Sequence, residues 1–310
     1  MAEDNNTSLN GQTVILAGAT GNLGGRIARS LLGRGASVRA IVRPGSARDE
    51  VAALQAHGAA IVISDFKSVS ELAKACVGGD CVISALSGLE EVILEAQRVL
   101  LHAAVEAGVP RFIPSDFAID FTKLQRGGNR NLDLRLAFSE RLDSAPIAAT
   151  SVLNGMFTDL LTGEAPLILF PLRRVIYWGD ADQPLDFTTV SDTAAFAAAA
   201  LDPSAPRYLR IAGDTLSARG LVEAASEATG KEFRLFRVGG LGTLGTMIKA
   251  TRLLMPKSKE VFPPWQGMQY LRDMFSGQAK LEPLDNNRYP EMAWTTVRQV
   301  LAQHVKHSQE

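Results

Sequence analysis

The stretch that most constrains the fold is residues 13–43, which combine two short apolar runs with a glycine-rich turn. The first run (13–17) ends abruptly at a glycine, as is typical of a buried strand in a parallel sheet. The turn (18–24) leads into a segment (25–32) with apolar residues at helical spacing, and a second apolar run (37–42) follows. A strand, a glycine turn, a helix and a strand within about thirty residues form a βαβ unit. The sequence therefore predicts an α/β protein built on a doubly wound parallel sheet.

The three spaced glycines of this turn suit a bound dinucleotide. Gly18 permits a tight turn, Gly21 lets the backbone approach a pyrophosphate, and Gly24 allows helix and strand to pack closely. The helix N-terminus then offers unpaired N–H groups and the positive end of its dipole to phosphates. The alternative is a tight turn of any α/β protein, but the complete unit favours a Rossmann-type domain. The predicted cofactor-binding residues of the turn are Gly18, Ala19, Thr20, Gly21, Asn22, Leu23 and Gly24.

The residue after the second strand indicates which dinucleotide binds. An acidic residue there would bind the ribose 2′-hydroxyl of NAD(H), whereas an arginine accommodates the 2′-phosphate of NADP(H). This chain has Arg43 at that position, and no Asp or Glu lies between Val38 and Arg48. A guanidinium also binds phosphate as a bidentate donor. We therefore predict NADP(H) as the cofactor, with a solvated surface arginine as the alternative reading of Arg43.

Composition excludes several other classes of protein. The net charge of −1 provides no basic surface for nucleic acid or for an anionic membrane. The polar N-terminus (1–7) resembles neither a signal nor a transit peptide, and no apolar run is long enough to span a membrane, so we expect a cytoplasmic protein. Cys76 and Cys81 read as small buried residues rather than a redox pair. The four histidines are scattered, so we predict no metal site.

Two later strands are followed by residues suited to the adenosine half and the ribose of the cofactor. The third strand (59–63) precedes Asp65, a candidate acceptor for the adenine amino group, and Phe66, which can lie against the ring. Alternatively, Asp65 caps a turn before the next helix. The fourth strand (81–86) ends in small residues where a ribose would approach the backbone, namely Ala85, Leu86 and Ser87.

The fifth and sixth strands place polar residues where the nicotinamide is expected. Ligands of open parallel sheets bind in the crevice beyond the carboxyl ends of the strands. The fifth strand (111–113) opens into Ser115, Asp116 and Phe117, which we place beside the nicotinamide. The sixth strand (147–152) is followed by Asn154, a further predicted cofactor contact.

The alternation of strand and helix weakens after this point, which predicts a second, smaller lobe. We assign residues 1–155 to the dinucleotide-binding domain, with 185–215 returning to its sheet. Residues 156–184 and 216–310 form a substrate-side lobe that carries Trp265, Met268 and Tyr270. Residues 121–131, rich in glycine, asparagine and charge, read as a mobile loop.

A second glycine pattern, at residues 240–245, matches GxGxxG but lacks the context of the first. It follows a strand-like segment (232–238) and precedes a helix-like one (246–254). No second strand and no ribose-binding residue follow it. We therefore interpret it as a glycine-rich hinge or lid rather than a nucleotide site.

The glycine spacing, together with a few later motifs, resembles that of a known family. The turn reads GATGNLG, and residues 111–117 read RFIPSDF. With the Asn154-Gly155 turn, residues 186–192 and residues 285–290, these motifs resemble the NmrA-like and isoflavone-reductase-like family of atypical short-chain dehydrogenases/reductases. The resemblance implies an NADP-binding domain with a small C-terminal substrate lobe.

The resemblance is incomplete at the residues expected to handle protons. No tyrosine is followed four residues later by the lysine that lowers its pKa in the better-known short-chain enzymes. Isoflavone-reductase-like enzymes use a lysine on the helix before the sixth strand, and residues 132–141 contain none. Arg135 is the nearest cation there, but a pKa above about 12 makes it a poor proton shuttle. The catalytic candidates are therefore Arg135, Ser115 and, from the loop, Lys123, although either cation can be a solvated surface charge.

Two functions fit these features. The first is an NADPH-dependent reductase of a small apolar carbonyl or unsaturated substrate, in which Arg135 or Ser115 steadies the developing oxyanion. The second, implied by the NmrA side of the resemblance, is an NADP(H)-binding redox sensor without turnover that regulates a partner protein. The missing proton donor favours the sensor, and the apolar, aromatic lobe favours the enzyme.

Overall fold

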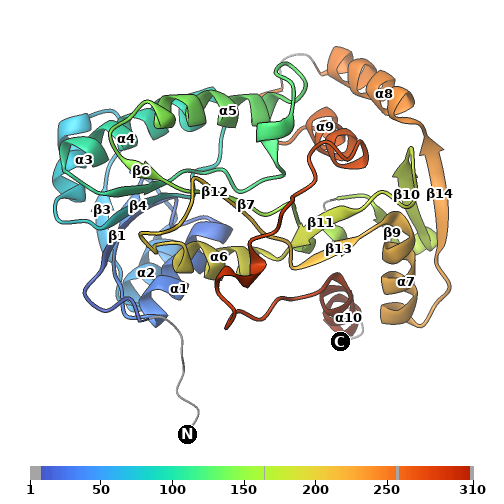
Figure 1. Cartoon of the computed structure of the whole chain (residues 1–310), viewed down its shortest axis with the longest axis horizontal. Helices are drawn as coiled ribbons and strands as arrows, with labels where there is room; N and C mark the ends of the chain where they lie inside the picture. Colours follow the sequence, from blue (N-terminus) through green and yellow to red (C-terminus); the bar gives the residue numbers. More distant parts are fainter. Residues whose placement is uncertain (1–7, 164, 256–257, 308–310) are drawn as a thin grey trace, which may run out of the picture.

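A parallel six-stranded sheet organises the N-terminal half of the chain (Figure 1). The computed structural model describes residues 8–163, 165–255 and 258–307, so the N-terminal segment 1–7 used above lies outside the described residues. The strand order is β3-β2-β1-β4-β5-β6, and every neighbouring pair runs parallel. The strands are β1 (Thr13–Ala17), β2 (Ser37–Val42), β3 (Ala60–Ile63), β4 (Cys81–Ser84), β5 (Arg111–Ile113) and β6 (Ala148–Ala149).

Helices cover both faces of this sheet, which confirms the predicted Rossmann-type α/β fold. Alternate residues of β1 serve opposite faces: Val14 and Leu16 pack with α1 and α6, and Ile15 and Ala17 pack with α3 and α4. The helices of this half are α1 (Asn22–Gly33), α2 (Arg48–Ala56), α3 (Val69–Cys76), α4 (Gln97–Glu106) and α5 (Arg130–Asp143). A π-helical turn, η1 (Glu91–Ala96), runs directly into α4.

The predicted sixth strand divides at Thr150. The N–H of Thr150 still donates to Phe112 O of β5 (3.1 Å), but the next N–H, of Ser151, donates to Arg207 O (2.8 Å). The chain therefore leaves the main sheet as β7 (Ser151–Leu153) and pairs with β12 (Tyr208–Arg210). A change of pairing partner within a continuous apolar run leaves no mark in its hydrophobic pattern.

The segment 185–215 does not rejoin the six-stranded sheet, contrary to expectation. β11 (Leu185–Thr188) pairs with β13 (Asp214–Leu216) and β8 (Met156–Phe157) in a separate sheet. The helix α6 (Val190–Ala199) packs along α1, and β12 pairs with β7, the second half of the predicted sixth strand. The apolar pattern of a short strand indicates that it is buried but not which sheet it joins. The domain boundaries themselves stay a prediction.

The C-terminal lobe has its own core and its own small sheet, β14-β10-β9. Trp178, Phe187 and Phe275 are among its buried side chains. Its strands and helices are β9 (Ile168–Leu169), β10 (Arg174–Trp178), β14 (Arg234–Gly239), α7 (Ala218–Thr229), α8 (Leu241–Leu254), α9 (Pro264–Phe275) and α10 (Val297–His307), with 3₁₀ turns η2 (Phe121–Lys123), η3 (Thr158–Thr162), η4 (Phe170–Leu172) and η5 (Asn286–Arg288).

None of the described helices is long and apolar enough to cross a membrane. No group of three or more histidine, cysteine or acidic side chains in the described ranges is arranged to hold a metal ion.

Candidate functional site

The glycine turn between β1 and α1 is closed against backbone on two sides. Gly18 has φ +83°, and a Cβ there would lie 2.5 Å from Ala85 O, at the end of β4. A Cβ on Gly24 would lie 2.1 Å from Gly18 O, and one on Gly21 3.4 Å from the same oxygen. The N–H of Gly21 donates to Gly18 O (3.0 Å), which closes the turn. Only glycine fits at positions 18 and 24, as a backbone cradle for a diphosphate requires.

The N-terminus of α1 is open to an anion. Its cap residue is Gly21, and within the described part of the chain no side chain caps it. Asn22, which has the chemistry of a cap, instead accepts a hydrogen bond from Arg26 Nε (3.0 Å). The first N–H groups of the helix are therefore left for a ligand, at the positive end of the helix dipole.

The adenosine side of the predicted site contains Arg43, Asp65 and Phe66. Arg43 lies directly after β2 and is exposed, and its carbonyl accepts from Ser46 N (3.1 Å) and Oγ (2.9 Å) in the turn that follows. Asp65 pairs with Lys67 Nζ (3.2 Å), and the hydrogen bonds from Lys67 lower the pKa of its carboxyl group. Asp65 Oδ1 accepts from Lys67 N (3.0 Å) and so caps the turn before α3, whose own cap residue is Ser68.

Phe66 is less accessible than the sequence suggested. Its φ is +60°, a region that a bulky residue rarely adopts. Its ring is 5% exposed and packs with Ile41 and Leu72 in the core. Contacts of Asp65 and Phe66 with an adenine stay predictions.

At the ends of β4 and β5, Ser115 connects two segments that were predicted separately. Its Oγ donates to Leu86 O (2.6 Å), and its N–H donates to Gln97 Oε1 (2.8 Å). Ala85 and Leu86 thus lie beside Gly18 on one side and Ser115 on the other, and Ser87 is exposed at the opening. The hydroxyl proton of Ser115 is already donated to backbone, which limits its use as an oxyanion donor.

Asp116 is a fully buried carboxyl group at this edge. Burial raises its pKa to about 6, and the hydrogen bond from Ser151 Oγ (2.6 Å) and the charges of Arg135 and Arg207 oppose that rise. Its Oδ1 has no hydrogen-bond partner among the described residues. A group with this pKa exchanges a proton close to neutral pH.

Arg135 lies between Asp116 and the substrate-side lobe. It is 9% exposed, its Nη1 donates to Asn131 O (3.1 Å), and its Nε has no hydrogen-bond partner among the residues described. Its charge acts on Asp116 and on Tyr270 of α9, whose phenol pKa is raised by burial and lowered by Arg135. The guanidinium is therefore a buried positive charge between the sheet edge and α9.

The ammonium group of Lys123 is held by polar contacts rather than free in solvent. Its Nζ donates to Lys280 O (2.7 Å) and lies 3.6 Å from Asp120 Oδ2. The segment 121–131, expected to be a mobile loop, is also hydrogen-bonded to α9. Asn129 donates to Asp273 Oδ2 (2.8 Å) and accepts from Gln266 Nε2 (2.7 Å). A proton-donor role for Lys123 stays a prediction, and in this arrangement its ammonium group stabilises the C-terminal segment.

Phe117 and Asn154 close the site toward the lobe. Phe117 is 7% exposed and packs in the core beneath α6. Asn154 is fully buried, its N–H donates to Ala118 O (2.9 Å), and neither atom of its side-chain amide has a hydrogen-bond partner in the described structure. Orphaned polar atoms at a strand end are consistent with a ligand that completes the site.

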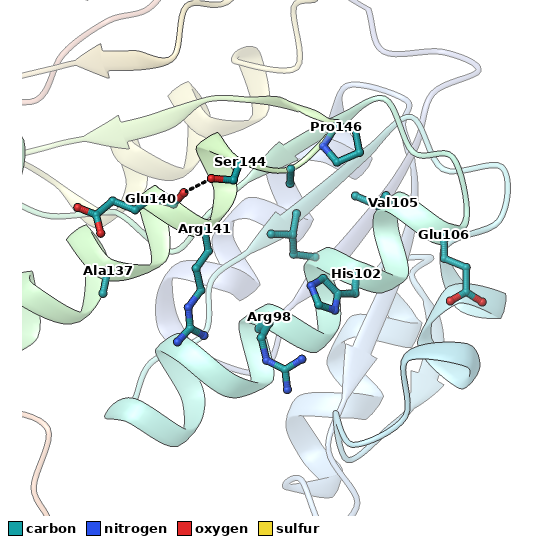
Figure 2. A pocket seen from close by; sticks show the side chains of 11 residues that line it. Arg98, His102, Val105, Glu106, Ala137, Glu140, Arg141, Ser144 and Pro146 are labelled. Carbon is teal, nitrogen blue, oxygen red and sulfur yellow. Dashed lines mark hydrogen bonds between the residues drawn. The ribbon is translucent and has the colours of Figure 1, made fainter.

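A pocket of about 330 Å³ opens beside the glycine turn, between α1, η3 and the start of α6. Sequence analysis assigned its η3 side to the substrate-side lobe but named none of the residues there as site residues. A larger groove, about 810 Å³, lies between α4 and α5 and contains none of the predicted site residues (Figure 2). The smaller pocket is lined by Asn22, Leu23, Phe157, Asp159, Leu160, Thr162, Gly163 and Val190.

The fold and the cradle define a Rossmann-type α/β protein whose glycine turn is shaped for a diphosphate. The chain belongs to the NmrA-like family, whose profile matches residues 10–263. It is 27% identical over 319 residues to the bifunctional pinoresinol-lariciresinol reductase of Forsythia intermedia, covering 94% of this chain and 98% of that protein.

Solved structures share the same fold at lower identity. AtPrR2 with NADP⁺ and (+)pinoresinol superposes with a TM-score of 0.79 at 22% identity, covering 95% of this chain and 99% of that one. The leucoanthocyanidin reductase–NADPH complex from Vitis vinifera gives 0.79 at 19% identity, with the same coverages.

Proposed function

We propose that this protein binds NADP(H) and is an NADPH-dependent reductase of a small apolar carbonyl or unsaturated substrate. The observation that carries the proposal is the cradle in which Gly18 and Gly24 leave no room for a Cβ, at the open N-terminus of α1. Relatives named as reductases, one of them solved with NADPH, support it.

Each end of the crevice has a distinct task in this proposal. The N–H groups at the start of α1 bind the diphosphate, and the exposed guanidinium of Arg43 binds the 2′-phosphate. When bound, NADPH supplies a hydride from its nicotinamide ring. The ends of β4 and β5, at Leu86 and Ser115, orient that half of the cofactor.

Arg135 is the residue we assign to the substrate oxygen. Its buried charge, with Nε unpartnered among the described residues, stabilises negative charge that develops on a carbonyl or enolate oxygen. An arginine does not deliver the proton that completes reduction. Asp116, which shares the field of Arg135 and has a pKa raised by burial to about 6, exchanges a proton near neutral pH and is the group to test for that transfer.

The substrate class is inferred from the residues of the lobe near Arg135. The phenol of Tyr270 feels the charge of Arg135, and Met268 and Tyr270 pack against the apolar core of the lobe. The proposed substrate is therefore a small, largely apolar molecule with one reducible oxygen-bearing or unsaturated group.

A panel of enones, quinones and aldehydes tests the proposal through NADPH oxidation at 340 nm. We expect steady oxidation with at least one class and an Arg135→Met variant that is slower by roughly 10²-fold. Silence across the panel, with tight NADPH binding, would reject the reductase.

The second candidate is a redox sensor that regulates a partner protein, favoured by the lack of any lysine on α5. A sensor requires different affinities for NADP⁺ and NADPH, because only differential binding shifts a conformational equilibrium. Calorimetry that finds equal affinities would remove it.

A further inference from the structure

We propose that Gln97 is a positioning residue that holds the ends of β4 and β5 in the geometry needed by the nicotinamide half of the cofactor. The inference rests on the proposed binding of NADP(H). It concerns a residue that the sequence did not single out, because one glutamine in a helix normally faces solvent.

Both polar ends of the Gln97 side chain are occupied inside the protein. The residue is 0% exposed. Its Nε2 donates to Ile93 O (3.0 Å), one turn back, and its Oε1 accepts the N–H of Ser115 (2.8 Å). The first bond orients the amide so that its oxygen, and not its NH₂ group, faces β5.

Ser115 needs this outside acceptor because of its local backbone. The N–H of Asp116 donates to Pro114 O (2.8 Å), which makes Ser115 the centre of a tight three-residue turn just past β5. The turn leaves the N–H of Ser115 without a local acceptor, and an unpaired buried N–H costs about 1–3 kcal/mol. Gln97 supplies the acceptor and thereby fixes the turn that leads into Asp116.

The contacts continue from Ser115 to the glycine turn. Ser115 Oγ donates to Leu86 O (2.6 Å), and the N–H of Ala85 donates to Ala17 O (2.8 Å) at the end of β1. Ala85 O is the atom that a Cβ on Gly18 would strike. Ser115 and Leu86 therefore tie the turn that Gln97 fixes to the end of β4, where the nicotinamide half of the cofactor is proposed to lie.

The π-helical turn explains how Gln97 reaches this position. Its backbone N–H donates to Val92 O, five residues back, at the junction of η1 and α4. An extra residue in one turn rotates the following side chains by roughly 100° relative to an uninterrupted α-helix. Such wide turns often occur at functional sites, and here the turn directs an amide rather than an apolar side chain toward β5.

The test compares two ligands that differ only in the nicotinamide half. NADPH has it, and 2′-phospho-ADP-ribose lacks it while keeping the diphosphate and the 2′-phosphate. We expect Gln97→Met to weaken NADPH binding by roughly tenfold and to leave the affinity for 2′-phospho-ADP-ribose unchanged. Gln97→Glu keeps an acceptor for Ser115 and, once protonated, a donor for Ile93, so its NADPH affinity should recover toward the wild-type value at acidic pH.

Gln269→Met is the matched control, since Gln269 is also a buried helical glutamine whose amide accepts a backbone N–H, that of Arg130 (3.3 Å). It should change neither affinity, and thermal melts report whether each variant is folded. If Gln97→Met weakened the binding of both ligands equally, or weakened neither, the positioning role would be overturned. A wild-type protein that binds neither ligand would instead reject the proposed function.

Discussion

Two glycine turns in this chain start a helix in nearly the same way, and only one of them is built as a cradle. Gly21 caps α1 with φ −84° and ψ 165°, and Gly240 caps α8 with φ −86° and ψ 175°. Neither cap has a side-chain hydrogen bond in the described structure. The backbone of the helix end is therefore not what distinguishes the two.

The difference lies in what surrounds the glycines. Gly18 and Gly24 are pressed against backbone, whereas a Cβ on Gly240, Gly242 or Gly245 would meet nothing within 4 Å. The first turn follows β1, which has β2 and β4 on either side. The second follows β14, which among the described strands pairs only with β10. A glycine pattern thus indicates a phosphate site only where the neighbouring strand ends supply walls, which central strands do and this outer strand does not. Rejection of residues 240–245 as a nucleotide site stays a prediction.

The largest effect is expected from Gly24→Ala. Its Cβ would lie 2.1 Å from Gly18 O, and no flexible side chain is available to move aside. We expect a loss of about 3 kcal/mol or more in the free energy of unfolding, together with loss of NADPH binding. Urea unfolding and calorimetry measure these, with Gly240→Ala as the control that changes neither. Wild-type stability in Gly24→Ala would remove the claim that the first turn is a closed cradle.

This comparison also shows what the sequence could and could not predict. The βαβ unit was predictable because strand, turn and helix are adjacent in the chain and each leaves its own pattern. The break at Thr150, the pairing of β7 with β12 and the burial of Gln97 depend on segments far apart in sequence. Phe66 was singled out only by its position after the third strand, and its unusual φ and its burial follow from packing alone.

A second prediction uses the buried carboxyl group that shares the sheet edge with the first turn. Burial raises the pKa of Asp116 to about 6, above the ordinary value of 3.8. The folded protein therefore binds more protons than the unfolded chain between these values, and the free energy of unfolding falls as the pH rises through that window. Ionisation of this group should therefore lower the free energy of unfolding by on the order of 2 to 3 kcal/mol between acidic and neutral pH.

Asp116→Asn has no group to titrate at that position and should lack this contribution. Chemical unfolding of the wild-type protein and the variant from pH 4 to pH 8 gives the difference between their free energies of unfolding. This difference should change between about pH 4 and pH 6 and stay constant at higher pH. A difference that is the same at every pH would show that Asp116 ionises normally.

Arg43→Ala tests whether the first turn belongs to an NADP(H) site rather than to a generic diphosphate site. Removal of the guanidinium should weaken NADPH binding by roughly 10- to 100-fold and leave NADH binding unchanged, since only NADPH carries the 2′-phosphate. Fluorescence titration with both nucleotides measures the two affinities. Equal effects on NADPH and NADH would mean that Arg43 does not contact that phosphate.

The smallest effect is expected in the second turn, and its sign is opposite. Gly242 and Gly245 lie inside α8, where a glycine costs about 0.5 to 1 kcal/mol relative to alanine because it loses more backbone entropy on folding. Among the described residues, no atom beyond the adjoining residues and nearby backbone of α8 lies within 4 Å of a Cβ at either site. Gly242→Ala and Gly245→Ala should therefore each raise the free energy of unfolding by up to that amount. Urea unfolding at neutral pH, with NADPH titrated into each variant, measures both properties. Destabilisation, or loss of NADPH binding, would show that this turn has a ligand or a contact that its open surroundings do not indicate.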